Sequence, residues 1–184
     1  MAAAGFLKSV YLRYLSKPAG ERKLLSLIKR HKLHRIVELG IGNGQRAVRM
    51  IELAQRYHDS EIHYAGIDMF EARSEPQPGL PLKQAYKQLR ATGAKVQLIP
   101  GDPFSSLARS ANSLSDTQLL ILAASEQGES LERAWFYVPR MLAPQAIVLV
   151  QRAGDDPARA RYEQLSRIEI ERLAGATQQR KRAA

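Results

Sequence analysis

The feature that most constrains the fold is an alternation of short apolar runs with longer segments of helical period. Several of the short runs are apolar at nearly every position, which is typical of strands buried on both faces of a parallel sheet. The five runs are Ile36–Leu39, Ile62–Ile67, Lys95–Ile99, Gln118–Ala123 and Ala146–Gln151. Because strands and helices alternate, we predict a doubly wound α/β fold. It is expected to be a three-layer αβα domain with a mostly parallel sheet of about five strands.

The intervening segments carry apolar residues at the spacing of amphipathic helices. In one of them, residues 45–57, Val48 and Ile51 lie on an apolar stripe. Arg46 and Arg49 lie on the opposite, polar face. The other predicted helices cover 21–32, 82–91 and 130–142, with one more at about 6–15.

The sequence after Gln151 predicts a helix and no further strand. Asp156 followed by Pro157 is a helix-opening pair, and the helical spacing of apolar residues continues to Leu173. Since no sixth or seventh strand, and so no final β-hairpin, is predicted, one edge of the sheet is expected to be exposed. An exposed edge needs cover, so we expect a helix or the second subunit of a homodimer there.

Positive charge is concentrated at the two ends of the chain, which has a net charge of +10. Residues 1–35 hold nine Lys/Arg and one acid, residues 175–184 add three basic residues, and residues 36–174 are nearly neutral. We therefore predict a basic N-terminal helical cap, a central α/β domain and a basic, disordered tail. Basic ends attract phosphate or anionic surfaces. The hypothesis is an anionic or nucleic-acid partner, and the alternative is a solvated helix and tail.

The chain contains no cysteine, which excludes disulfides, zinc–thiolate sites and thiol nucleophiles. Near the N-terminus, Lys8 and Arg13 interrupt the apolar residues, unlike the uninterrupted stretch of a signal peptide. No run approaches the roughly 18 apolar residues that a membrane-spanning helix needs. We therefore expect a cytoplasmic protein.

Three glycines separate the first predicted strand from the helix that follows it. The segment IVELGIGNGQ places Gly40, Gly42 and Gly44 at this junction. Glycine there permits a positive φ and lets a ligand approach the backbone closely, and helix N-terminal amides face whatever lies above the loop. The strand before and the helix after strengthen the prediction of a cofactor loop. Counted from Gly42, Ala47 also fits the dinucleotide pattern, so an NAD site stays open.

The same segment resembles the first motif of class I S-adenosylmethionine-dependent methyltransferases, V-E-L-G-x-G-x-G. The resemblance covers roughly residues 36–151. It implies a Rossmann-like methyltransferase domain over 36–174 and S-adenosylmethionine as the cofactor. It also implies that the glycine loop wraps the methionine portion of the cofactor, and that the strand acid, matched by Glu38, helps to order it.

Two aspartates at the ends of the next strands extend the resemblance. It implies that Asp68, in YAGID, accepts hydrogen bonds from both ribose hydroxyls, which suits an acceptor-only carboxylate. It also implies that Asp102, in the segment LIPGDPF, accepts from the adenine amine beside Phe104. Each aspartate has an alternative role as a turn or cap residue, since Asp followed by Pro also opens helices. The predicted cofactor-binding residues are Glu38, Gly40, Gly42, Gly44, Asp68, Met69, Asp102 and Pro103.

The catalytic apparatus is less evident than the cofactor site. Where many relatives carry an acid after the fourth strand, this chain has Ala124 or Ser125, so no metal-dependent mechanism is supported and no metal site is predicted. Glu126 lies on a segment that could reach the site, but no catalytic residue is assigned. The first hypothesis is a methyltransferase with an unidentified acceptor. The alternatives are a catalytically silent methyltransferase-like binding or assembly protein, and an NAD-linked enzyme.

Overall fold

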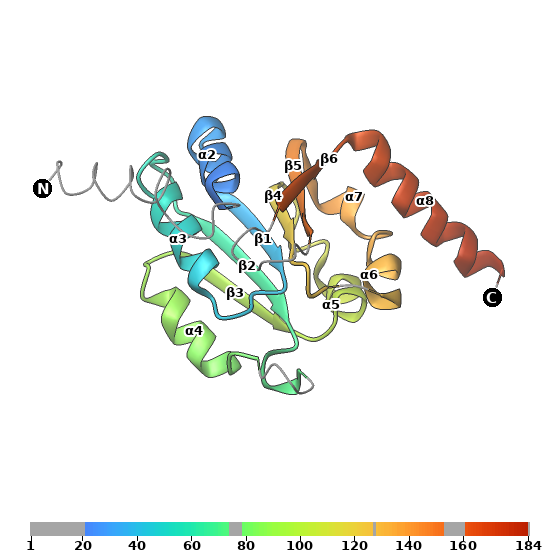
Figure 1. Cartoon of the computed structure of the whole chain (residues 1–184), viewed down its shortest axis with the longest axis horizontal. Coiled ribbons are helices and arrows are strands. Elements are labelled where there is room, and N and C mark those ends of the chain that lie inside the picture. The colour runs from blue at the N-terminus through green and yellow to red at the C-terminus, as the bar shows by residue number, and fades with distance from the viewer. Residues whose placement is uncertain (1–20, 74–78, 127, 153–160, 184) are drawn as a thin grey trace, which may run out of the picture.

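The computed structural model describes residues 21–73, 79–126, 128–152 and 161–183, with side chains up to Thr177 in the last range. Its centre is a six-stranded sheet in the order β3-β2-β1-β4-β5-β6 (Figure 1). The strands are β1 (Arg35–Leu39), β2 (His63–Asp68), β3 (Lys95–Pro100), β4 (Thr117–Leu122), β5 (Leu142–Arg152) and β6 (Arg161–Leu165). The first five pair in parallel and match the predicted runs, whereas β6 is antiparallel to β5. The predicted fold class is confirmed, with one strand more than expected.

The path of the chain reverses at the middle of the sheet. β1 pairs with β2 on one side and with β4 on the other. From β1 the strands are added outward to β3, and the chain then returns to the other side of β1 to form β4. In open α/β sheets, ligands bind beyond the carboxyl ends of the strands at such a switch point. Here the residues that follow those ends are Gly40 and Ala123.

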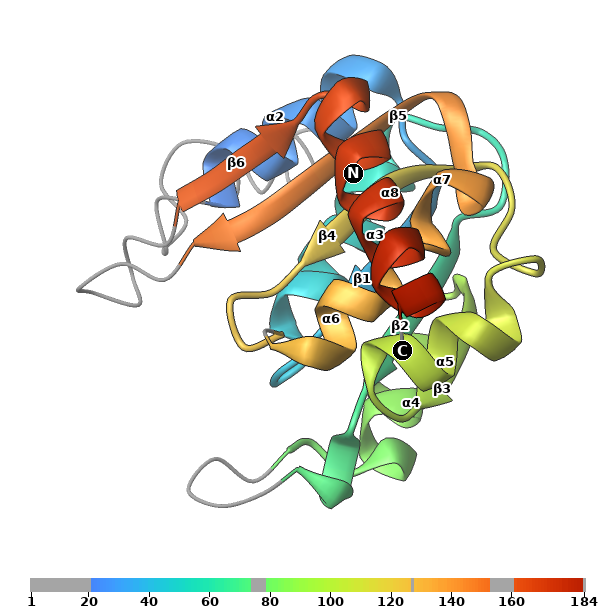
Figure 2. The ribbon, with the colours of Figure 1, turned by 90° about the vertical axis from the view of Figure 1, so that its right-hand side faces the viewer.

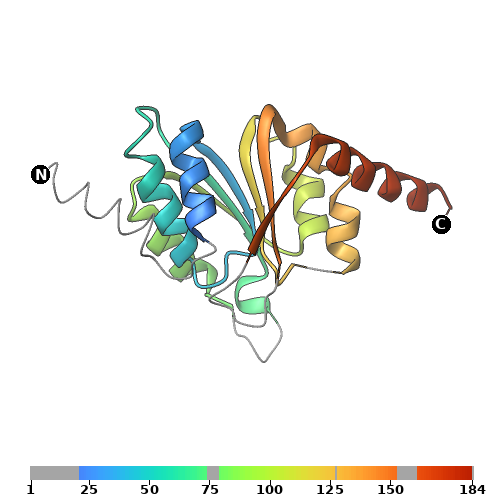
Figure 3. The same cartoon turned by 45° about the horizontal axis from the view of Figure 1, so that its top comes forward.

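Helices cover both faces of the sheet (Figure 3). One face is packed by α2 (Glu21–His31), α3 (Gln45–Ala54) and α4 (Leu82–Arg90). The other is packed by α5 (Pro103–Ser110), α6 (Glu129–Ala134), α7 (Val138–Met141) and α8 (Arg167–Ala183). None of the helices in the described ranges combines the length and apolar character needed to cross a membrane.

The central strand β4 shows why the apolar runs are continuous. Leu119 and Ile121 belong to the core on one face of the sheet, while Leu120 and Leu122 belong to the core on the other. All four are fully buried. Because burial of such a side chain contributes about 1.5–3 kcal/mol relative to exposure, both faces of this strand select apolar residues.

Strand β6 corrects the predicted end of the chain, where we expected one helix from Asp156 to Leu173. Asp156 and Pro157 lie outside the described residues, and Arg161–Leu165 form a strand instead. Figure 2 shows β6 beside β5, and the pairing runs from Val148 opposite Leu165 to Arg152 opposite Arg161. Tyr162 is buried between exposed neighbours, which is the alternation of a half-buried strand. The edge of β5 that we expected a helix or second subunit to cover is therefore paired with β6.

The last helix begins later and ends later than predicted. The Ser166 hydroxyl accepts a hydrogen bond from the Glu169 amide at 3.3 Å, and the Glu169 carboxylate accepts from the Ser166 amide at 2.7 Å. This reciprocal pair is a capping box, and it fixes the start of α8. The helix continues to Ala183, so residues 175–183 are helical rather than a disordered tail. Their glutamine, arginine, lysine and alanine residues have high helix propensity.

The predicted helix over 130–142 is divided into α6 and α7. Residues 135–137 form a turn between them. Pro139 lies in the first turn of α7, a position that tolerates its missing N–H, whereas the interior of a longer helix would not. The predicted helix at about 6–15 lies outside the described residues.

Candidate cofactor site

The glycine loop leaves β1 with three residues in the left-handed region, Gly40, Gly42 and Gly44, at φ values of 82°, 61° and 74°. A Cβ on Gly40 would lie 2.7 Å from the Cβ of Ala123, so the end of β4 approaches the loop too closely for a side chain. A Cβ on Gly42 would meet no atom within 4 Å. The loop is therefore tightly packed at Gly40 and has open space at Gly42.

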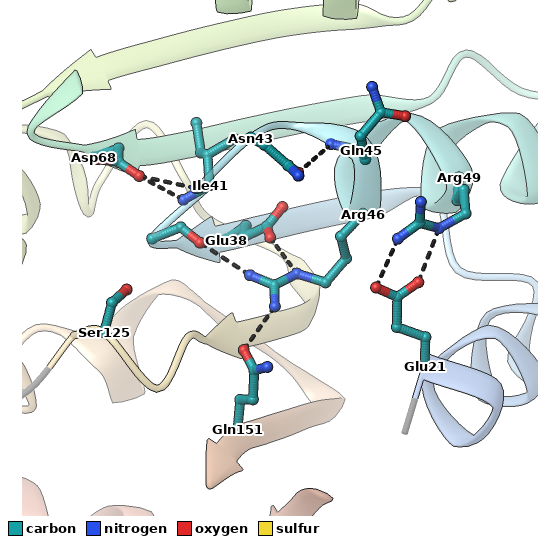
Figure 4. A network of polar contacts seen from close by, with 12 residues as sticks. Glu21, Glu38, Ile41, Asn43, Gln45, Arg46, Arg49, Asp68, Ser125 and Gln151 are labelled. Carbon is teal, nitrogen blue, oxygen red and sulfur yellow. Dashed lines mark hydrogen bonds and ion pairs between the residues drawn. The ribbon is translucent and has the colours of Figure 1, made fainter. Parts of the chain in front are cut away.

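The carboxylate of Asp68 ties the glycine loop to the end of β2. Its Oδ2 accepts from the amides of Ile41 at 2.7 Å and Gly42 at 3.2 Å (Figure 4). Its Oδ1 accepts from the amide of Phe70 at 3.1 Å and from Nη2 of Arg73 at 2.7 Å. Asp68 is buried, and four donors fill the roughly four acceptor positions of a carboxylate. Donors from the protein itself therefore fill the acceptor positions of Asp68, the residue predicted to receive the ribose.

Arg73 connects Asp68 to the segment after β4. The same Nη2 that contacts Asp68 lies 3.1 Å from Oε1 of Glu126. Burial acts against the charged form of Arg73, but the hydrogen bonds and attraction to these two acids raise its pKa. Burial raises the pKa of Glu126, and the attraction to Arg73 opposes that effect. Among the described residues, the buried Nε of Arg73 has no hydrogen-bond partner.

Glu38 lies beneath the loop in a buried ion pair. Its Oε1 accepts from Nε of Arg46 at 2.5 Å, and its Oε2 accepts from the hydroxyl of Tyr64. Burial alone would lower the pKa of Arg46, but attraction to Glu38 raises it. Because Glu38 has no exposed surface, its role in this structure is to order the loop from below.

Arg46 extends this pair into a network across the sheet (Figure 4). Its Nη2 donates to the carbonyl of Gly40 at 2.9 Å. Its Nη1 donates to Oε1 of Gln151 at 2.7 Å and to the hydroxyl of Tyr162 at 3.1 Å. One guanidinium therefore connects the glycine loop with β5 and β6.

Several solved structures with a similar fold are methyltransferases. The O-methyltransferase from Bacillus cereus in complex with SAH is 14% identical, with a TM-score of 0.54 over 95% of this chain and 75% of that chain. The O-methyltransferase TomG from Streptomyces achromogenes in complex with SAM is 13% identical, with a TM-score of 0.54 over 97% and 77%. The TehB-like SAM-dependent methyltransferase from Corynebacterium glutamicum is 14% identical, with a TM-score of 0.51 over 96% and 80%. The chain has the fold of these methyltransferases.

The likeness lies in structure and not in sequence. No family model matches the chain, and no curated protein sequence matches it. The chain spans about three quarters of the length of the three solved structures. With the methyltransferase fold established, the remaining predicted residues can be placed on it.

Asp102 caps α5 at the carboxyl end of β3. Its carboxylate accepts from the amides of Phe104 at 3.0 Å and Ser105 at 3.1 Å, and from the hydroxyls of Ser105 and Ser130. Although burial acts the other way, hydrogen bonds from the two serines hold the pKa of Asp102 at about 2. Pro103 follows in the first turn of α5. Asp102 therefore has the helix-capping role that the sequence analysis gave as its alternative.

The structure brings most of the predicted residues to one edge of the sheet. Gly40, Gly42 and Asp68 are in direct contact or adjacent, and Met69 beside them is 36% exposed. Asp102 lies at the end of β3 and is held by its own segment and α6 rather than by the glycine loop. The predicted adenine neighbour, Phe104, packs against the guanidinium of Arg133, which lies 3.8 Å from the ring centroid.

A cavity of about 310 Å³ opens at the carboxyl ends of β4 and β5. Its lining includes Ala123, Glu126, Trp135, Val150 and Gln151. Glu126 also contacts Arg73 beside the glycine loop, so one carboxylate borders both the loop cluster and the cavity. Within the described part of the chain, no three His, Asp or Glu side chains converge as a metal site would require.

Arg46 and Arg73 are the main site residues that the sequence analysis missed. The helical pattern predicts only that Arg46 lies on the polar face of its helix, whereas in the structure its side chain is only 13% exposed. Arg73 follows the end of β2 by five residues and matches no motif. A buried acid such as Glu38 needs a cationic partner, and that requirement is the one signal that could have prompted a search for Arg46.

Proposed function

We propose that the protein is an S-adenosylmethionine-dependent methyltransferase whose cofactor lies over Gly40–Gly44. The observation that carries the proposal is the position of the glycine loop at the switch point of a methyltransferase fold. The space next to Gly42 is open. Beneath the loop, Glu38 and Arg46 fix the carbonyl of Gly40. A loop positioned in this way before binding loses little conformational freedom when a ligand arrives.

The residues present fit this cofactor. The backbone of Gly40, Gly42 and Gly44 would hold its methionine portion, and the open space at Gly42 admits a ligand against the main chain. Asp68 would receive the ribose hydroxyls. Since its four acceptor positions are filled, the side chain of Arg73, the donor that can leave without breaking the loop, would give up its position to a ribose hydroxyl. Met69, Asp102 and Pro103 would lie on the adenine side.

S-adenosylmethionine supplies an electrophilic methyl group on its sulfonium. The protein would accelerate transfer by positioning the two reactants. The glycine loop would hold the methyl donor, and the cavity at the ends of β4 and β5 would orient the methyl acceptor. A base is needed only where the acceptor must lose a proton. Glu126 is the best placed group for this role, since it borders the cavity and its pKa is raised chiefly by burial.

Calorimetric titration with SAH tests this proposal. We expect the protein to bind SAH, and Gly42→Leu to abolish binding because the new side chain would fill the space above the loop. Gly93→Leu is the matched control, since Gly93 has a φ of 81° and a Cβ there would meet only Gln55, at 3.9 Å. NADH titrated in parallel tests the NAD alternative and is expected not to bind. If the wild-type chain does not bind SAH at millimolar concentration, or if Gly42→Leu binds it normally, the proposal fails.

A second candidate is a methyltransferase-like protein that binds or assembles without catalysis. The observation that favours it is that all four acceptor positions of Asp68 are satisfied by the protein. A chain with this arrangement is stable without a ligand. Turnover on any acceptor, followed as SAH production, would remove this candidate.

We also propose an anionic or nucleic-acid acceptor, a cytoplasmic location and a homodimer. The basic segments of the chain support an anionic or nucleic-acid acceptor, and the lack of cysteine is compatible with the cytoplasm. A homodimer would form through β6, which is the last strand of the sheet order. Light scattering on the purified chain tests the dimer.

A further inference from the structure

Three basic residues form a row at the edge of the sheet opposite the glycine loop. Arg35, His63 and Lys95 are the first residues of β1, β2 and β3. They are in register, with Arg35 paired to His63 and His63 paired to Lys95. Residues opposite one another on neighbouring strands point to the same face of a sheet. The three side chains therefore stand next to one another.

The row borders a cavity of about 120 Å³. Its other wall is formed by Ser113 and Ser115, in the segment before β4, and by Thr117, the first residue of β4. One water needs roughly 10–15 Å³ of such space, so the cavity has room for a group several times larger. It combines cationic side chains with hydroxyl groups, and it lies at the amino ends of the strands, away from the candidate cofactor site.

The charges of the row are poorly compensated. The side chains of Arg35 and Lys95 form no ion pair or hydrogen bond within the part of the chain that the structure describes, whereas the amide of Arg35 donates to Oε1 of Gln118 at 3.3 Å. His63 lies 3.5 Å from Glu61, whose side chain is 60% exposed. The nearby Asp116 is also exposed. Burial lowers the pKa of His63, and the positive charges of Arg35 and Lys95 lower it further.

Helix dipoles do not account for this row. Basic residues such as Lys29 and Arg30, in the last turn of α2, are stabilised by the negative end of the helix. Arg35 and Lys95 instead begin the two strands that flank β2, and, besides burial, the charge of each lowers the pKa of His63 between them. A bound anion would balance the charges of Arg35 and Lys95, and the last turn of α2 adds positive charge only a few residues before Arg35.

We propose that this cavity binds a phosphate group. Arg35 would contact it through its planar guanidinium and Lys95 as a point charge, the two usual modes of phosphate recognition. The hydroxyl of Ser115 would complete the contacts, as serines do on phosphate oxygens, whereas the hydroxyl of Ser113 already donates to the carbonyl of Ser110 at 2.8 Å. Inorganic phosphate, a phosphorylated small molecule and a nucleic-acid backbone share this chemistry. The site is independent of the proposed methyl transfer.

The first test uses the wild-type chain and inorganic pyrophosphate. Titration followed by amide chemical shifts is expected to perturb residues of the cavity wall, His63, Lys95, Ser113 and Ser115, while the amide of Gly42 stays unchanged. If pyrophosphate leaves these amides unmoved, or shifts basic residues over the whole surface to the same extent, the proposal is overturned. This test requires no variant to fold.

The second test compares two double variants of equal charge. Arg35→Gln with Lys95→Gln removes two cations from the row. Lys83→Gln with Arg161→Gln removes two from the opposite edge of the sheet. The first pair is expected to weaken pyrophosphate binding by about tenfold or more, since two charged contacts are lost, while the second pair leaves it unchanged. Equal losses in the two double variants would show diffuse attraction and contradict a built site.

A labelled single-stranded RNA separates the possible sources of the phosphate. If the source is a nucleic-acid backbone, Arg35→Gln with Lys95→Gln weakens RNA binding and lowers the slope of log affinity against log salt by about 1.4, for two lost contacts. If the pair affects pyrophosphate but not RNA, the site takes a free phosphate or a small phosphoester. Titration with SAH, expected to be unchanged in this variant, keeps the result separate from the cofactor proposal.

Discussion

The guanidinium of Arg73 lies 2.7 Å from Oδ1 of Asp68, at the carboxylate proposed to receive the ribose of the cofactor. The same guanidinium reaches Glu126 at 3.1 Å. Asp68 cannot accept the ribose hydroxyls while its other donors and Arg73 all remain in place, because its acceptor positions are filled. If Asp68 receives the ribose as proposed, Arg73 competes with the cofactor for that carboxylate.

Arg73→Ala is expected to bind SAH more tightly than the wild-type chain. A hydrogen bond to a charged group contributes about 1.5–3 kcal/mol, and the variant no longer has to break this one when the ribose binds. Calorimetric titration should show an affinity gain of about tenfold to a hundredfold. Arg90→Ala on α4 is the control for the loss of one positive charge. A weaker affinity in Arg73→Ala alone would mean that Arg73 holds the cofactor instead of competing with it.

Removing the partner of Glu38 is expected to destabilise the whole fold. Arg46→Met leaves a buried carboxylate without its cation, which costs about 3–5 kcal/mol of unfolding free energy. Urea denaturation measures the loss. Arg152→Gln breaks the exposed pair with Glu163, whose side chains are 61% and 50% exposed, and should change stability by at most about 1 kcal/mol. Equal effects of the two substitutions would contradict the structural role of the buried pair.

Asp102 is expected to make the fold sensitive to acid. Its pKa in the folded chain is about 2, below the ordinary value of 3.8. The stability that it contributes is therefore present above its ordinary pKa and is lost as the pH falls through the folded value. Asp102→Asn keeps a capping side chain but should flatten the dependence of unfolding free energy on pH over this window. An unchanged dependence would show that other acids cause it.

Gly40→Ala is expected to be more destabilising than Gly93→Ala, although both glycines have a φ near 80°. Each variant suffers the strain of a left-handed residue, about 1–2 kcal/mol. Only at Gly40 does the new methyl group lie 2.7 Å from the Cβ of Ala123, and such overpacking adds about 1–3 kcal/mol. Thermal denaturation compares the two, and equal melting temperatures would refute the close approach of β4 to the loop.

Much of the fold could be predicted because its signals are local. The strands β1, β2 and β4 are buried along nearly their whole length, so their apolar runs are continuous, and the glycine loop depends on backbone conformations that glycine adopts readily. Strand β6 could not be predicted in this way. Tyr162 and Leu165 also fit a helical spacing, and what selects the strand is a pairing with β5 and a hydrogen bond from Arg46, 116 residues away in the sequence.

The candidate site shows the same division between local and distant signals. Gly40, Gly42 and Asp68 were found from motif and spacing, and the structure brings them into contact. The partners of the buried acids, Arg46 and Arg73, were not predicted. A salt bridge between distant elements produces no periodic pattern in the sequence. The polar face of α3 illustrates this, since Arg49 forms a two-contact ion pair with the buried Glu21 at 2.8 and 2.6 Å. The helix face that the sequence predicts to be polar is here partly an internal interface.

A crystal structure of the chain soaked with SAH would test directly whether the cofactor lies over Gly40–Gly44. We predict ligand density over Gly42, with the ribose hydroxyls on Asp68 and the side chain of Arg73 moved away from that carboxylate. Density at another place on the molecule would contradict cofactor binding over the glycine loop. A bound ligand with the contact between Arg73 and Asp68 intact would contradict the displacement of Arg73 by the ribose.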